Sequence, residues 1–212
     1  MSRPRLLDLF CGAGGAAAGY AAAGFEVVGV DIRPMPRFPF EFHEADALTY
    51  PLAGFDVIHA SPPCQRYSKS VSRRARATRP DLIAPIRDRL RASGRLYVIE
   101  NVPGAPLLDP VTYCGSSFGL AVRRHRLFES NVSLVAPPCD HAGQPVVLGV
   151  YGTGGPDNRA NRPGGGGRKV AGADAAAALG IDWTTDQRRL SQAIPPAYTE
   201  HLGRQLLTLL AA

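Results

Sequence analysis

Residues 5–31 read RLLDLFCGAGGAAAGYAAAGFEVVGVD, and this stretch decides the fold class. The apolar run from Arg5 to Phe10 is typical of a buried strand, and the alanine-rich run from Ala16 to Ala23 favours a helix that stops at Gly24. Glu26 to Asp31 is a second apolar run, and it ends in a carboxylate. A strand, a glycine turn, a helix and a second strand predict a mostly parallel sheet with a right-handed crossover. We therefore expect an α/β protein.

The glycine turn between these two strands is a candidate cofactor site. Gly12 and Gly14 let the backbone approach a ligand closely, and Asp31 at the tip of the second strand suits a ribose diol. Gly12-x-Gly14-x-x-Ala17 followed by Asp31 also fits the nicotinamide dinucleotide fingerprint. Glycines that serve only a tight turn would give the same letters. The local pattern therefore leaves the identity of the cofactor open.

A second stretch, Ser61-Pro62-Pro63-Cys64-Gln65, carries a candidate nucleophile. It follows an apolar strand expected at 55–60, and its prolines resist helix, so the backbone should hold Cys64 in place. Basic residues follow the thiol, with no acidic residue before Asp81: Arg66, Lys69, Arg73, Arg74, Arg76 and Arg79. Positive charge lowers the pKa of a nearby thiol and attracts a polyanion. We therefore expect a reactive thiol beside a nucleic-acid-binding surface.

Composition agrees with a nucleic-acid partner. The 212 residues suggest one domain, or one domain with a small appendage. The net charge is +6 and the pI is about 9.5, with arginine supplying almost all of the positive charge. Arginine binds phosphate and guanine in a bidentate way. No secretion signal and no membrane-spanning run is visible, so we expect a cytoplasmic, reduced protein without a membrane partner.

The cysteines do not predict a disulfide framework or a metal site. Cys11, Cys64, Cys114 and Cys139 show no paired spacing. Cys139 and His141 are separated by one residue, but no second closely spaced ligand pair accompanies them. A zinc site usually takes four ligands, so we expect no metal.

Two further motifs lie at or near expected strands. A core-facing helix at 80–92 leads to a strand at 96–99, and Glu100-Asn101-Val102 follows that strand. A carboxylate buried at a strand end is costly unless it has a partner or a role. Arg124 and Arg126 would share one face of a strand, so both could point at one anionic or carbonyl target.

Taken in order, these motifs resemble those of the DNA cytosine-5 methyltransferases. Residues 10–15, FCGAGG, match the family's Phe-x-Gly-x-Gly-Gly; residues 63–65, PCQ, match its nucleophile motif; and residues 100–102, ENV, match its second catalytic motif. The resemblance covers residues 5–130 and 188–210. The chain departs from the family at a few positions: Val122 stands where the family has Gln, Ser191 and Gln192 replace Gly and Asn, and Ile32 replaces a common aromatic residue.

The resemblance implies a Rossmann-like, S-adenosylmethionine-dependent methyltransferase fold, in which helices flank the sheet. Cys64 would attack C6 of a cytosine flipped out of DNA, Glu100 would protonate N3, and Asn101 would orient the adjoining backbone. Arg124 and Arg126 would hold the cytosine carbonyl and a flanking phosphate. S-adenosylmethionine would contact Phe10, Gly12, Gly14, Gly15, Asp31, Ile32, Asp46, Pro62, Gln192 and Ala193.

The expected organisation is a catalytic and cofactor-binding part at 1–135, a small target-recognition segment at 136–186 and a C-terminal segment at 187–212. The middle segment is rich in Gly and Pro, which predicts a poorly packed, basic region. The expected partner is double-stranded DNA, bound by a monomer. Nucleic-acid contacts are expected from Gln65, Arg66, Lys69, Arg73, Arg74, Arg76, Arg159, Arg162, Arg168 and Lys169. The same chemistry on RNA, a nicotinamide oxidoreductase and an inactive nucleic-acid-binding module are the alternatives.

Overall fold

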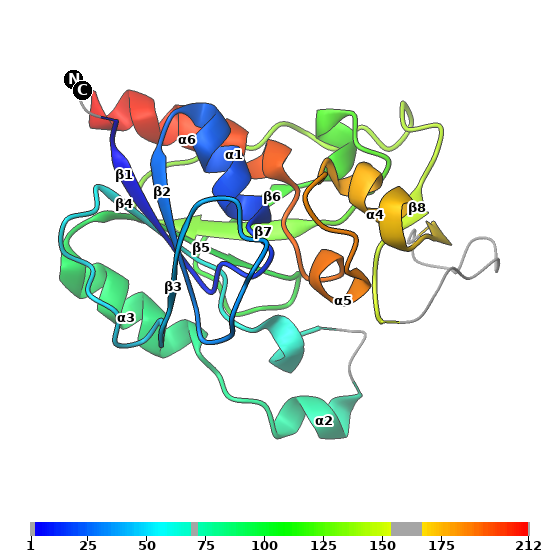
Figure 1. Ribbon diagram of the computed structural model, residues 1–212. Helices are drawn as coiled ribbons and strands as arrows, with labels where there is room; N and C mark the ends of the chain where they lie inside the picture. Colours follow the sequence, from blue (N-terminus) through cyan, green and yellow to red (C-terminus); the bar gives the residue numbers. More distant parts are fainter. Residues whose placement is uncertain (1–2, 69–71, 154–166, 212) are drawn as a thin grey trace.

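The computed structural model describes residues 3–68, 72–153 and 167–211. Within these ranges the centre of the molecule is a seven-stranded sheet in the order β3-β2-β1-β4-β5-β7-β6 (Figure 1). Its strands are β1 (Arg5–Leu9), β2 (Glu26–Asp31), β3 (Glu41–Glu44), β4 (Val57–Ala60), β5 (Leu96–Asn101), β6 (Val111–Tyr113) and β7 (Arg126–Ser130). The helices are α1 (Gly15–Ala23), α2 (Arg73–Ala77), α3 (Ile83–Ser93), α4 (Gly172–Leu179), α5 (Gln187–Leu190) and α6 (Pro196–Leu210). Short elements complete the fold: the 3-10 turns η1 (Cys64–Arg66) and η2 (Gly115–Phe118), and the strand pair β8 (Leu148–Gly149) and β9 (Arg168–Lys169).

The strand directions define where a ligand would bind. β3, β2, β1, β4 and β5 run parallel, and β7 runs antiparallel to both of its neighbours. The chain leaves β1 for β2 on one side and later returns to β4 on the other, so β1 and β4 flank a topological switch point. Ligands of open α/β sheets bind outside the carboxyl ends of the strands at such a point. The residues that follow β1, β2, β4 and β5 therefore meet at one edge.

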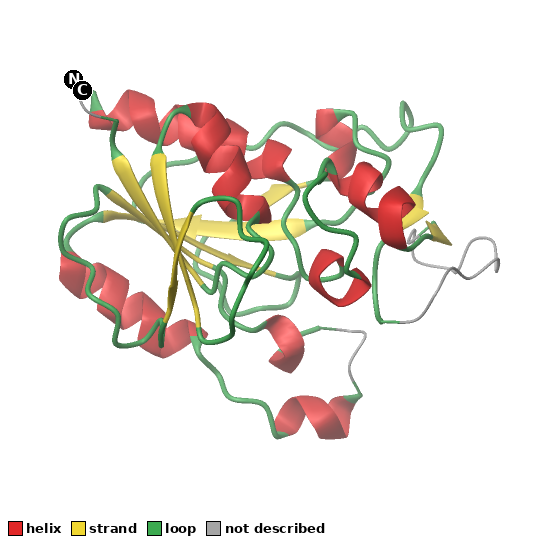
Figure 2. Cartoon of the chain, in the orientation of Figure 1, coloured by secondary structure: helices red, strands yellow, loops and turns green. Residues whose placement is uncertain are grey.

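Different helices cover the two faces of the sheet, with α1 and α6 on one face and α3 on the other (Figure 2). Successive side chains of a strand point to opposite faces, so Leu6 and Leu7 enter different cores. Leu6 packs with Tyr20 of α1 and Leu202 of α6, whereas Leu7 packs with Ile86 of α3. The sheet is thus buried on both sides, as a parallel sheet requires.

Two glycines allow α1 to lie unusually close to the C-terminal segment. A Cβ atom at Gly15 would lie 2.1 Å from the carbonyl oxygen of Ile194, and one at Gly19 would lie 2.0 Å from that of Pro196. A backbone carbonyl cannot rotate away as a flexible side chain can, so both positions exclude a side chain. Gly15, expected beside the cofactor, therefore has a packing role that accounts for its identity.

A third hydrophobic cluster joins the segment after β7 to the glycine turn. Val150, Val170 and Leu190 pack in it together with Ala13. Val122, which stands where the family has Gln, is 2% exposed and belongs to the same cluster. The prediction of a poorly packed middle segment is therefore wrong for Val150 and Val170, which share a small core with the rest of the chain. Target recognition by this segment stays a prediction.

The segment before β7 also differs from expectation. β7 begins at Arg126, and Arg124 lies in the preceding loop with a φ of 37°. The prediction that Arg124 and Arg126 share one face of a strand is therefore wrong, because a residue in the left-handed region interrupts the extended backbone. By contrast, β2 has the bounds expected from its sequence. Among the described helices, none combines the length and apolar character needed to cross a membrane.

Candidate active site

Cys64 lies just beyond the carboxyl end of β4 and begins η1. Pro63 caps this turn, and the thiol-bearing residue is half-buried. The side-chain amide of Asn101, at the end of β5, donates a hydrogen bond to the carbonyl oxygen of Pro62 at 2.9 Å. Asn101 thus links the turn that carries Cys64 to the neighbouring strand, and its orienting role in catalysis stays a prediction.

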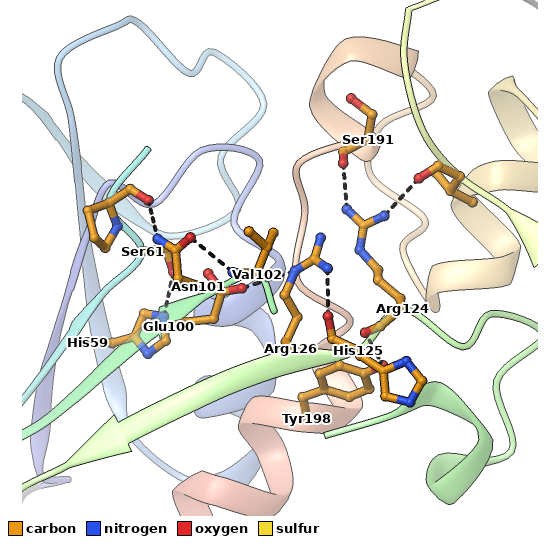
Figure 3. A network of polar contacts seen from close by, with 12 residues as sticks. His59, Ser61, Glu100, Asn101, Val102, Arg124, His125, Arg126, Ser191 and Tyr198 are labelled. Carbon is orange, nitrogen blue, oxygen red and sulfur yellow. Dashed lines mark hydrogen bonds and ion pairs between the residues drawn. The ribbon is translucent and has the colours of Figure 1, made fainter. Parts of the chain in front are cut away.

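Glu100 and Arg126 form a buried ion pair near Cys64 (Figure 3). Nε of Arg126 lies 3.0 Å from Oε1 of Glu100, and the two side chains are only 13% and 8% exposed. Burial raises the pKa of Glu100, and the positive charge of Arg126 opposes that shift. A carboxyl group with a raised pKa is suited to donating a proton near neutral pH.

A chain of buried hydrogen bonds leads from Glu100 back to α1. The Ser61 side chain hydrogen-bonds Glu100, and Nε2 of His59 lies 2.8 Å from Oγ of Ser61. Nδ1 of His59 lies 2.9 Å from the Tyr20 hydroxyl. Burial lowers the pKa of His59 to about 3, so its ring is neutral. With Glu100 ionised, Ser61 donates to the carboxylate and accepts from Nε2–H of His59, and Nδ1 accepts from Tyr20.

The electrostatics around Cys64 differ from the sequence-based expectation. Burial raises the pKa of the thiol, Glu100 raises it further, and Arg126 offsets only part of the rise. Arg66, the first basic residue after the thiol, has its Nε 3.9 Å from Oδ2 of Asp81. The prediction of a lowered thiol pKa is therefore wrong, because buried surroundings and a nearby carboxylate outweigh the basic run.

Arg124 binds backbone carbonyl groups from later parts of the chain (Figure 3). Its Nη1 donates to the carbonyl oxygen of Val150 at 2.8 Å, and its Nη2 donates to those of Ser191 at 2.7 Å and Leu190 at 3.3 Å. Burial, reinforced by the charge of Arg126, lowers the pKa of Arg124 to about 9. The guanidinium group thus joins three segments, and its buried Nε has no hydrogen-bond partner among the described residues.

The carboxyl ends of β1 and β2 form the candidate cofactor site. Oδ2 of Asp31 accepts the backbone N–H of Gly12 at 3.1 Å, and Oδ1 accepts that of Arg33 at 3.0 Å. Gly12 has a φ of +51°, and a Cβ atom there would meet nothing within 4 Å. Ile32 is 69% exposed beside it, and Oδ1 of Asp46 accepts the backbone N–H of Leu48 at 2.9 Å. Open space over Gly12 and acceptors at two strand tips fit an adenosyl cofactor.

The other expected cofactor residues differ in backbone conformation and in burial. Phe10 and Gly14 both have positive φ, at 60° and 83°, so the turn is tightly bent. Pro62 and Ala193 are buried, whereas Gln192 is exposed. Gln192 is next to Ala193 in the sequence, but no described contact ties the Gln192 side chain to the site.

Three residues near the site were not identified from the sequence. Trp183 donates its indole N–H to the carbonyl oxygen of Ala13 at 2.7 Å, and the ring of Phe38 lies 3.0 Å from where a Cβ atom of Gly14 would be. Together with Gly12, Trp183 and Phe38 line a shallow hollow. Asp8 on β1 is fully buried, and burial raises its pKa well above the ordinary value. Trp183 and Phe38 come from loops without a motif, so only the fold reveals their position.

The structure describes most of the expected nucleic-acid-binding residues, and they differ in how exposed they are. Arg73 and Arg74 are exposed on the short helix α2, which projects from the body in Figure 1, and Arg76 and Gln65 are half-buried. Arg168 is exposed, and Nζ of Lys169 lies 5.6 Å from the centre of the Tyr151 ring. Lys69, Arg159 and Arg162 lie outside the described residues.

Comparison with solved structures identifies the fold. A protein described as a DNA modification methyltransferase encoded within an E. coli prophage aligns over 99% of this chain and 100% of its own, with a TM-score of 0.67 and 15% identity. The chain has a methyltransferase fold. Entamoeba histolytica methyltransferase EhMeth aligns over 99% of both chains (TM-score 0.65, 12% identity), and S. pombe Dnmt2 methyltransferase aligns over 100% of both (0.64, 13%). No protein-family model and no curated protein sequence matches the chain.

The methyltransferase fold explains why the candidate residues meet. The antiparallel β7 inserted between β5 and β6 distinguishes this sheet from the six-stranded parallel order of dinucleotide-binding domains. Glu100 of β5 is opposite Phe128 of β7, and Arg126, two residues before Phe128, reaches Glu100 with its side chain. These neighbours agree with the resemblance read from the sequence motifs.

Proposed function

We propose that this protein transfers a methyl group from S-adenosylmethionine to C5 of cytosine in DNA. The observation that carries the proposal is the grouping of Cys64 with the buried Glu100–Arg126 pair, next to the glycine turn at the switch point. A thiol nucleophile, a carboxyl group of raised pKa and a fixed cation are the three groups that activation of a pyrimidine requires.

Cys64 is the nucleophile in this proposal. Its sulfur forms a bond to C6 of the cytosine while Glu100 delivers a proton to N3, which turns C5 into an enamine-like carbon. When bound, S-adenosylmethionine supplies an electrophilic methyl group. After C5 has accepted the methyl group, C5 loses its proton to solvent and the C6–S bond breaks. The 5,6 double bond then re-forms with release of the thiolate, and N3 returns its proton to the carboxylate of Glu100.

The ion pair provides a route to the thiolate. In the free protein the carboxylate of Glu100 raises the pKa of Cys64. Transfer of the thiol proton to Glu100 would remove this repulsion and leave Arg126 beside the new thiolate. The same transfer loads Glu100 with the proton that N3 needs. The raised pKa values of both groups thus favour a coupled proton shift over two independent ionisations.

The cofactor residues in this proposal are Gly12, Asp31 and Asp46, with Ile32 against the adenine. Asp31 would accept hydrogen bonds from the ribose hydroxyls with the lone pairs that Gly12 and Arg33 leave free. Asp46 would accept the adenine amino group through the oxygen that is not bonded to Leu48.

Methyl transfer from tritiated S-adenosylmethionine tests the proposal. Unmethylated plasmid DNA, transfer RNA and a protein-free blank are incubated with the wild-type chain and with Cys64→Ser. Tritium in DNA cytosine, present with the wild type and absent with the variant, is the expected result. Tritium in RNA alone would support the same chemistry on the alternative substrate. The absence of label in every polymer, with intact cofactor binding, would support an inactive binding module and overturn the proposal.

A nicotinamide oxidoreductase is the less favoured reading. It would use Gly12 and Asp31 but would give no role to Cys64 or to the Glu100–Arg126 pair. Calorimetry with S-adenosylmethionine and with NAD separates the two readings, since only one of these ligands should bind.

A further inference from the structure

Four potential metal ligands that are far apart in the sequence meet beside β6 and β7. They are Cys114, His125, Cys139 and His141, and their ligand atoms all lie within 4.8 Å of one another. Sγ of Cys114 lies 3.3 Å from Nε2 of His141, and Sγ of Cys139 lies 3.5 Å from Nε2 of His125. We propose that these four side chains form a structural zinc-binding site.

Two of the separations match the metal closely. Cysteine sulfur and histidine nitrogen bind Zn²⁺ tetrahedrally at bond lengths that place the ligand atoms about 3.3–3.8 Å apart. The two Sγ–Nε2 separations given above fall within this range. Two thiolates neutralise the charge of the ion, and two neutral imidazoles complete the Cys₂His₂ set. Four protein ligands leave no open position, which is typical of a structural site.

The fold builds one half of the site by strand pairing. β6 and β7 are antiparallel, and Tyr113 faces Arg126, so Cys114 and His125 are the next residues to face each other. A hydrogen bond from the backbone N–H of Gly115 to the carbonyl oxygen of Arg123, at 2.7 Å, continues the pairing. Because ten residues separate Cys114 from His125 in the chain, their sequence spacing does not suggest a ligand pair.

The other half of the site arrives on the loop after β7, and hydrogen bonds from η2 hold this loop. The Ser117 hydroxyl donates to the carbonyl oxygen of Pro138 at 2.7 Å, and the backbone N–H of Asp140 donates to Oγ of Ser116 at 3.1 Å. Oγ of Ser116 also lies 3.1 Å from Sγ of Cys114, where its hydroxyl can donate to a metal-bound thiolate. The loop is therefore held in position by contacts other than those of the four ligands.

A disulfide between Cys114 and Cys139 is the competing explanation. It would leave the imidazoles of His125 and His141, whose ring centres are 5.3 Å apart, without a reason to converge on the sulfur atoms. A tetrahedral metal explains all four side chains at once.

The position of His125 gives the metal a structural consequence. His125 lies between Arg124 and Arg126, and Nη1 of Arg126 donates to its carbonyl oxygen at 2.9 Å. The Tyr198 hydroxyl donates to the carbonyl oxygen of Arg124 at 3.0 Å on the other side. A bound metal would therefore fix the short backbone segment that carries both arginines. None of the four ligands belongs to the proposed active site, so metal binding can be tested apart from methyl transfer.

Metal analysis of the full chain, expressed without a polyhistidine tag and purified under reducing conditions, tests the site. We expect one zinc per chain, and replacement by Co²⁺ should give the visible absorption of a tetrahedral ion with thiolate ligands. Cys139→Ser and His141→Asn should reduce the bound zinc at least tenfold. The matched controls Cys64→Ser and His43→Asn change a cysteine and a histidine outside the cluster, and both should keep one zinc per chain.

Chelation gives a readout of stability. A ligand present at about a thousand times its Kd raises the thermal midpoint of a chain this size by about 8–16 °C, so chelation should lower the midpoint by that amount.

X-ray absorption on the wild type should show two sulfur and two nitrogen ligands. This measurement uses only the wild type, so it does not depend on whether the ligand variants fold. Zinc-free protein after reconstitution, an iron–sulfur chromophore, full zinc in both ligand variants, or a Cys114–Cys139 disulfide in protein isolated without oxygen would each overturn the proposal.

Discussion

Replacement of Arg126 by Met should make the stability of the protein depend more strongly on pH through Glu100. In the wild type, Nε of Arg126 lies 3.0 Å from the carboxylate of Glu100, and both side chains are nearly buried. Met keeps much of the volume but removes the charge. Removing one partner of a buried pair costs about 3–5 kcal/mol, because the other charge stays buried without compensation. We expect a loss of that size at pH 8.

The direction of the pH effect follows from the pKa of Glu100. Burial already raises this pKa, and Arg126 is the main group that opposes the rise, so the variant should raise it further. A carboxyl group whose folded pKa exceeds its unfolded value holds more protons in the folded state, so stability falls as pH rises between the two values. The stability deficit should therefore be smallest at pH 5 and grow toward pH 8, by no more than about 1.4 kcal/mol per pH unit, the limit for one proton.

Urea unfolding of the wild type, Arg126→Met, Glu100→Gln and the double variant, followed by circular dichroism at pH 5, 6, 7 and 8, measures these quantities. Glu100→Gln in the Met background removes the titrating group, so the double variant should lose the pH dependence and recover part of the stability. The reasoning would be refuted by a deficit that is equal at every pH, or by a double variant that is less stable than Arg126→Met at pH 8.

Four shorter predictions follow from other parts of the structure. Cys64→Ser should abolish methyl transfer while leaving S-adenosylmethionine affinity nearly unchanged, and DNA with 5-fluorocytosine should trap the wild type covalently on a denaturing gel. Asp31→Ala should weaken S-adenosylmethionine binding by about 1–3 kcal/mol in calorimetry, the range for a hydrogen bond to a charged group; unchanged affinity would remove Asp31 from the cofactor site. Gly19→Ala should lower the urea midpoint, whereas Gly94→Ala, where a Cβ atom meets nothing within 4 Å, should show only the penalty of its positive φ; equal effects would argue against the close approach to Pro196. Bisulfite sequencing of methylated plasmid should show a target of about two to four base pairs, since each supported bidentate contact gives about 1–3 kcal/mol of discrimination and the middle segment can hold few of them; modification confined to one long site would contradict this.

The sheet was predictable because its signals are local. The apolar runs that form β1, β2, β4 and β5 are bounded by glycine, proline or polar residues, and β2 has the expected bounds. Cys64 and Glu100 each follow or end an expected strand, and a parallel sheet brings such strand ends to one edge. These inferences need only the alternation of strands and helices, which the sequence displays directly.

The remaining features depend on contacts between distant segments. The burial of Cys64 is the largest cause of the raised pKa of the thiol, and no sequence pattern contains it. The backbone of Arg124 bends at a residue whose φ of 37° could not be anticipated. Cys114 and His125 become neighbours only through the β6–β7 register. In each case the missing information is three-dimensional, so it is absent from spacing and composition.

The hydrogen bonds of Arg124 have a consequence for how the segment between Val150 and Leu190 can change. Arg124 binds main-chain carbonyl groups of Val150, Leu190 and Ser191, which every amino acid provides. The attachment of the segment is therefore largely independent of its side chains, apart from the few that pack in the shared core. Natural variation or directed evolution could therefore replace the exposed residues between Val150 and Leu190 and leave the attachment intact. Recognition of different targets by this segment, which stays a prediction, would thus require no change in how the segment is attached.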